Sequence, residues 1–212
     1  MRAYPDWSTI PDEYRLSFVV GEIVRNDVYA ENETKVLFGI LRANGLPCDE
    51  DMPRDFGYVI PLVRAMLRLP QVPAPFAKIG TQVIELTSRA HAVRRDTVHD
   101  ILVQMPFEPD RIGSGLGKKF RQMSDLEKCA DDLKEATWRL RAVYVIAPQW
   151  LGGPPAEWET VERLALWTRV AMGHIADYPH EIRGTPGRSP EPLGGFRVVD
   201  PVKREGDRFS NR

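Results

Sequence analysis

The sequence predicts an all-α protein, an up-and-down bundle of four to five helices with an irregular C-terminal tail, and three observations support this. Apolar residues recur every three or four positions over long segments, as expected for helices that bury one face. Helix start and stop signals flank these segments. The one short β-branched stretch, at residues 101–103, is followed closely by two prolines. We therefore expect only a loop or small hairpin at about residues 101–123.

The first long helix is expected to begin with a hydroxyl cap at Ser8 or Thr9, an early Pro11 and two acidic residues in its first turn, and to end at Asn44-Gly45. Its apolar stripe is interrupted in the middle by polar residues at places where apolar ones are expected: Asp27, Glu31 and Thr34. Such a gap either supplies a partner for a buried cation or marks a solvated stretch. The preceding arm, residues 1–10, is expected to be anchored on the bundle by Trp7.

Two further helices are expected before residue 102. A short one spans about residues 56–69 and contains Pro61 near its start. A proline-rich connector follows, and a long helix then starts near residue 75 and carries apolar positions as far as Leu102.

The segment after residue 102 contains a glycine-rich stretch, residues 113–119, that looks superficially like a phosphate-binding loop. A Walker A motif needs a hydroxyl residue directly after its lysine, and Phe120 follows Lys119 here. We therefore expect a flexible turn, with short extended segments at 101–105 and 118–123.

Two more helices are expected in the C-terminal half. Ser124 and Glu127 have the spacing of a capping box, which would start a helix running to about residue 147. A last helix is expected at about residues 156–178. From residue 181 on, Pro, Gly and Arg dominate, so residues 1–180 are expected to form one domain and residues 181–212 a poorly packed tail.

Charge and composition limit the function. The chain has 212 residues, is 42% hydrophobic and carries a formal net charge of −1, so no global charge attracts nucleic acid. Contact with RNA would need local basic patches, and two are candidates. The first holds Arg89, Arg94 and Arg95, and the second Lys118, Lys119 and Arg121.

Arg94 is the most informative residue of the long third helix. With Val83 as the centre of the apolar face, Arg94 lies about 20° from that centre at 100° per residue. A guanidinium stays charged, so it is rarely placed on a core face without a partner or a task. Five residues later comes His99, whose side chain can change charge near neutral pH.

The stretch Arg94-Arg95-Asp96-Thr97-Val98-His99 resembles the Arg-x(4–6)-His motif of the HEPN superfamily, all-helical bundles of which many are ribonucleases. In that family Asn, Asp or His often follows the arginine. Here Arg95 takes that position and Asp96 comes one place later. The resemblance covers about residues 12–175, and only the motif is specific.

This resemblance implies a metal-independent RNA endonuclease, such as a toxin or phage-defence effector, that needs no cofactor. Arg94 would bind the scissile phosphate and His99 would transfer a proton, supported by Arg95 and Asp96. The family places the motif at a homodimer interface, where both copies line one cleft. A protein antitoxin or another protein partner would be consistent with this class.

An alternative remains open, a non-catalytic helical dimerisation or interaction module. Arg94 would then form a structural ion pair with Asp27, Glu31 or Asp100. Of the carboxylates in the first helix we favour Glu31. If the third helix continues through His99, that ring points about 140° away from Arg94. For a catalytic pair, therefore, either the helix breaks near Thr97 so that His99 can turn toward Arg94, or the arginine partner of His99 is Arg95.

Other classes of site are not indicated. His91 and His99 lie two turns apart, which is not the spacing of helical metal ligands, and Cys48 and Cys129 form neither a metal spacing nor a disulfide framework. The sequence has neither a membrane-length apolar run nor a secretory signal at its start, so a cytoplasmic protein without membrane contact is expected.

Overall fold

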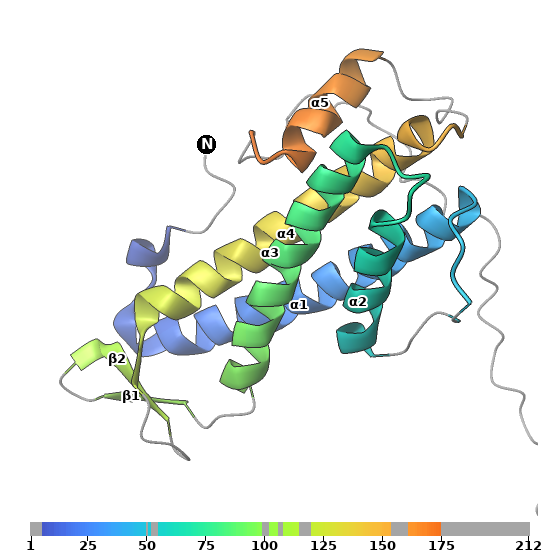
Figure 1. Cartoon of the computed structure of the whole chain (residues 1–212). Coiled ribbons are helices and arrows are strands. Elements are labelled where there is room, and N and C mark those ends of the chain that lie inside the picture. Colours follow the sequence, from blue (N-terminus) through green and yellow to red (C-terminus); the bar gives the residue numbers. More distant parts are fainter. Residues whose placement is uncertain are drawn as a thin grey trace, which may run out of the picture. The chain divides into compact units, whose positions relative to one another are not determined.

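The computed structural model describes residues 6–49, 51, 55–98, 102–105, 108–114, 120–153 and 161–174. The chain divides into two compact units, residues 1–179 and 180–212, and the second lies entirely outside the described residues. The first unit is mostly helical, which confirms the all-α prediction (Figure 1).

Three long helices form the body of the first unit (Figure 1). They are α1 (Asp12–Ala43), α3 (Ala74–Val98) and α4 (Met123–Trp150). The shorter α2 (Phe56–Leu67) packs against α1 and α3, and α5 (Val161–Ala171) packs against α4. Because α4 packs against α1, α3 and α5, it is the helix around which the core is built.

The core is apolar and closely enclosed. Its largest fully buried side chains come from all the long helices and include Ile23, Leu37, Phe38, Phe76, Ile84, Leu126, Leu133 and Leu140. Each fully buried side chain of this size contributes about 1.5–3 kcal/mol to folding. Because these side chains pack α1 against its neighbours, the polar stretch of α1 that contains Asp27 lies next to α3.

Several helix boundaries differ from the sequence prediction. The α4 capping box uses Gln122 and Asp125 rather than Ser124 and Glu127, because strand β3 (Phe120–Gln122) runs directly into the helix. Pro148 is tolerated inside α4, which continues to Trp150. Helix α5 ends at Ala171, before the predicted residue 178, because Gly173 adopts φ +76°.

Where a loop or small hairpin was expected, the described residues between 102 and 122 form a three-stranded antiparallel sheet in the order β1-β2-β3, one strand more than a hairpin. Strand β1 is Leu102–Met105 and β2 is Glu108–Ser114. Leu102 pairs with Ser114, and Gly113 pairs with Phe120 of β3. Residues 113–114, taken as part of a flexible turn, therefore belong to a strand. Residues 115–119 lie outside the described residues.

Two polar bridges fasten the edges of the bundle. Arg15 Nε donates to Glu127 Oε1 at 2.6 Å and its Nη1 contacts Asp110 Oδ1 at 3.2 Å, which joins α1 to α4 and β2. The hydrogen bond to Glu127 raises the pKa of Arg15. Trp7 Nε1 donates to Asp131 Oδ2 at 3.3 Å, as expected for an anchor of the leading arm.

Candidate functional site

Asp27 is the centre of a polar cluster between α1 and α3. Its side chain is only 4% exposed, and each of its two carboxylate oxygens faces a different residue of α3. His91 Nδ1 lies 2.8 Å from Oδ1, and Arg94 Nε lies 3.0 Å from Oδ2. We call Asp27, His91 and Arg94 the α1–α3 cluster.

The sequence folds this way because α1 and α3 pack through apolar faces. Asp27 occupies an apolar place in the α1 stripe, so packing carries its carboxylate to the helix–helix contact. Residues three apart on a helix are neighbours, so His91 and Arg94 reach one carboxylate together. The polar gap in α1 is thus a partner for cations rather than a solvated stretch.

Arg94 is held by charge more than by a directed hydrogen bond. Nε is within ion-pair distance of Asp27, yet its N–H does not point at the oxygen, and Nε is a buried polar atom without a hydrogen-bond partner. The side chain is 23% exposed. Within the described residues no partner is present for its two terminal amino groups, which are the donors that bind a phosphate bidentately.

His91 is fixed on two sides. Its Nδ1 meets Asp27, and its ring lies edge-on to Phe56 of α2, with centroids 4.7 Å apart and an interplanar angle of 62°. The side chain is 19% exposed. The sequence does not predict His91 as a partner of Asp27. Its position three residues before Arg94 is the signal that would place it in this cluster.

Helix α4 closes the cluster from the core side. Cys129 Sγ donates to the carbonyl oxygen of Ala90 at 3.6 Å, one residue before His91. Burial, followed by the negative charges of Asp132 and Asp27, raises the pKa of Cys129 to about 12. This thiol therefore stays protonated and acts as a packing group, since the thiolate is the nucleophilic form. Neither Cys129 nor Cys48 forms a disulfide.

The remaining predicted site residues are not gathered around Arg94. Glu31, the favoured partner, instead pairs with Lys35 at 2.5 Å, one turn along α1, so that expectation was wrong. Arg95 and Asp96 are both exposed, with Nε and Oδ1 3.7 Å apart. Arg89 is exposed on α3, and Arg121 is half-buried on β3.

Four predicted residues lie outside the described residues: His99, Asp100, Lys118 and Lys119. Helix α3 is described as far as Val98, and the Thr97 hydroxyl bonds to the Val93 carbonyl within the helix. The residues directly after it, where a break that turns His99 toward Arg94 would fall, lie outside the described residues.

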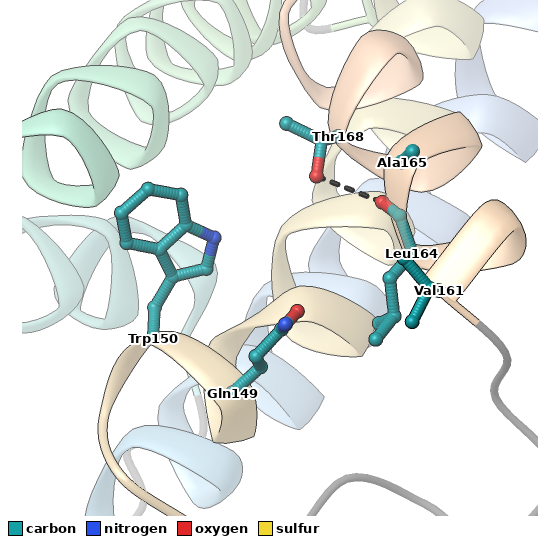
Figure 2. Close-up of a pocket in the computed structure, with 6 residues that line it drawn as sticks. All are labelled: Gln149, Trp150, Val161, Leu164, Ala165 and Thr168. Atoms are coloured by element: carbon teal, nitrogen blue, oxygen red, sulfur yellow. Dashed lines mark hydrogen bonds between the residues drawn. The ribbon is translucent and has the colours of Figure 1, made fainter.

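Two open surface pockets lie elsewhere in the described structure. One, of about 420 Å³, lies between the end of α4 and α5 and is lined by Gln149, Trp150, Val161, Leu164, Ala165 and Thr168 (Figure 2). The other, of about 470 Å³, follows the connection from α2 to α3 around Pro70 and Lys78. Neither pocket is lined by a residue of the α1–α3 cluster.

Among the described residues, no group of three or more His, Cys, Asp and Glu side chains is placed to hold a metal ion. In the same part of the chain, no helix combines the length and the apolar character needed to cross a membrane.

Comparison with known proteins found no match: no family model, no curated protein and no solved structure matches this chain. The chemistry of the α1–α3 cluster is therefore the basis for a functional proposal.

Proposed function

We propose that the protein is a metal-independent RNA endonuclease of the HEPN type, with its centre at Arg94 and His99. One observation carries this proposal. A buried carboxylate, Asp27, engages Arg94 through Nε and leaves both terminal amino groups of the guanidinium without a partner in the described structure. An arginine held in this way can bind a scissile phosphate and stabilise the charge that develops on it.

The proposed reaction uses the 2′-hydroxyl of the RNA as nucleophile, so neither a metal nor a cofactor enters it. His99, directly after α3, transfers a proton. Three exposed residues of α3 belong to the proposed site: Arg89, Arg95 and Asp96. The two arginines can contact neighbouring phosphates. Lys118, Lys119 and Arg121 extend the proposed RNA surface. A homodimer in which both motifs line one cleft belongs to the same proposal, as do a cytoplasmic toxin or phage-defence role and an antitoxin partner.

The experiment that tests this function is cleavage of a mixed-sequence RNA in the presence of EDTA. The wild-type protein is expected to cut the RNA and to leave 2′,3′-cyclic phosphate and 5′-hydroxyl ends. His99→Ala, with an unchanged circular dichroism spectrum, is expected to lose at least about 100-fold in rate, the usual contribution of a proton-transfer group. If the wild type leaves RNA intact in this buffer, the nuclease proposal is wrong.

A second candidate, a dimerisation module, is favoured by the outer face of α1. Five large apolar side chains of this helix are 44–63% exposed: Tyr14, Phe18, Val28, Tyr29 and Val36. They lie within an arc of about 100° by helical arithmetic, and we call this arc the outer α1 face. The same arc also holds two exposed polar residues, Arg25, which pairs with Glu22, and Asn32. Exposed apolar side chains grouped on one face of a helix indicate a partner.

The occupant that we infer for the outer α1 face is α1 of a second copy, running antiparallel. Glu13 and Arg42 lie on the same flank of the helix near its opposite ends. A two-fold axis near Val28 would bring Glu13 of one copy to Arg42 of the other, while the apolar residues meet between them. Asp27 points about 150° away from this face, so such a dimer would not place two Arg94 side chains in one cleft.

Oligomeric state tests the second candidate. The wild type is expected to be dimeric by sedimentation equilibrium at micromolar concentration. Tyr29→Glu is expected to raise the dimer dissociation constant at least about 100-fold, because it buries a charge at the apolar contact. Tyr58→Glu changes a tyrosine on α2 that is 69% exposed, compared with 51% for Tyr29, and is the control. A dimer that Tyr29→Glu leaves intact would rule out the outer α1 face as its interface.

A further inference from the structure

The α1–α3 cluster holds a histidine that the Arg94–His99 assignment does not use. We propose that His91 is the general base of the RNA cleavage reaction, a catalytic residue additional to Arg94 and His99. This inference rests on the proposed nuclease function and deepens it, since transfer to the 2′-oxygen needs one group to take a proton and another to deliver one.

The contact with Asp27 sets the tautomer of His91. A carboxylate accepts hydrogen bonds, so Nδ1, 2.8 Å from Asp27 Oδ1, carries a proton and donates. In the neutral ring Nε2 is then the atom with the free lone pair. A buried carboxylate that orients a histidine through Nδ1 and leaves Nε2 to accept a proton is the arrangement of hydrolase triads.

Nε2 is accessible to a substrate. Within the described residues it has no hydrogen-bond partner, and it is absent from the buried polar atoms that lack one, so it reaches the surface. The edge-on contact with Phe56 limits rotation of the ring. His91 is therefore restrained in its orientation, with a side chain that is 19% exposed and an Nε2 atom that is not fully buried.

The position of Arg94 completes the geometry. His91 and Arg94 share one carboxylate and are neighbours one turn apart on α3. In the proposed complex, a phosphate bound by the terminal amino groups of Arg94 lies on the side of α3 that also carries His91. The ribose attached to that phosphate carries the 2′-hydroxyl that must lose its proton.

The proposed step balances without another reactant. The 2′-hydroxyl proton passes to His91 Nε2, the 2′-oxygen forms a bond to phosphorus, and the bond from phosphorus to the 5′-oxygen breaks. His99 delivers a proton to the leaving 5′-oxygen. Asp27 stabilises the imidazolium that forms on His91, as a neighbouring carboxylate does for a histidine base. The products are a 2′,3′-cyclic phosphate and a 5′-hydroxyl.

The decisive variant is His91→Asn, whose side-chain amide can keep the hydrogen bond to Asp27 but cannot take a proton. We expect kcat to fall at least 100-fold, KM to stay within about threefold and the acid limb of the pH profile of kcat/KM to disappear. His174→Asn changes an exposed histidine after α5 and is expected to behave as the wild type. A thermal melt of each variant separates loss of fold from loss of chemistry.

A second substrate separates base from acid. With sulfur in place of the bridging 5′-oxygen, the leaving group needs no proton. We expect this substrate to rescue His99→Ala and not His91→Asn.

The outcomes distinguish the two proposals. An active wild type with fully active His91→Asn would overturn the role of His91 and leave the nuclease standing. Rescue of His91→Asn by the sulfur substrate would overturn its role as the base. No cleavage by the wild type would overturn both.

Discussion

Asp27→Ala is expected to lower the free energy of unfolding by about 3 kcal/mol, the largest single effect in the α1–α3 cluster. Removing one member of a buried ion pair typically costs about 3–5 kcal/mol, because the other charge is left uncompensated. The lower end applies here because Arg94 keeps a side-chain exposure of 23% and can turn toward solvent. Urea unfolding followed by circular dichroism measures this change.

Two further variants define what Asp27 contributes. Asp27→Asn retains the shape and an acceptor for His91 and removes the charge, so its loss of stability is expected to be smaller than that of Asp27→Ala. Glu31→Ala is the matched control on the same helix, because Glu31 forms only a partly exposed pair with Lys35. Its cost is expected to be about 0.3–0.5 kcal/mol. Equal costs for Asp27→Ala and Glu31→Ala would contradict a structural role for the cluster.

Alkaline pH is expected to reveal the buried thiol of α4. Burial raises the pKa of Cys129 from 9.0 to about 12, so between these pH values the thiol ionises in the unfolded chain first. The unfolded state then binds fewer protons than the folded state, and stability falls as pH rises, by about 1.4 kcal/mol per pH unit. The stabilisation is complete below pH 9 and is lost toward pH 12.

Cys129→Ala isolates this effect. At pH 7 the variant is expected to be less stable than the wild type by about 1 kcal/mol, because packing around the sulfur is lost. Its stability declines less steeply above pH 9, so the two curves cross. Tyr144→Phe should flatten a second part of the decline, between pH 10 and 12, because burial and the charge of Glu33 raise the pKa of Tyr144 to about 12. Urea midpoints under reducing conditions, measured from pH 7 to 11, would show whether the curves run parallel instead.

The helices themselves could be predicted from the sequence. Apolar residues at three- and four-residue spacing depend only on the local geometry of the helix, and Asn44-Gly45 marks the end of α1, where Gly45 adopts φ +81°. The helix boundaries that were predicted wrongly depend on contacts with residues that are distant in the sequence. Helix α4 starts at Met123 because strand β3 ends at the preceding residue, Gln122, and the Met123 side chain is fully buried in the bundle.

The site could be predicted only in part. Arg94 on an apolar face predicted a buried partner, and a polar gap in α1 indicated where that partner lies. The sequence could not decide between Asp27 and Glu31, which lie one turn apart on the same helix. A shift of one turn between α1 and α3 exchanges them, and that shift is decided by how the core side chains of both helices pack against α4.

The position of His91 also depends on tertiary packing and not on the local sequence. By itself the sequence determined an all-helical chain with an arginine on a core face, because helical periodicity is a local property. Tertiary packing alone decided that one carboxylate from α1 serves both His91 and Arg94, and that Phe56 of α2 holds the His91 ring. These contacts join residues up to 67 positions apart (Asp27 to Arg94), and no local pattern encodes which side chains meet over such a separation.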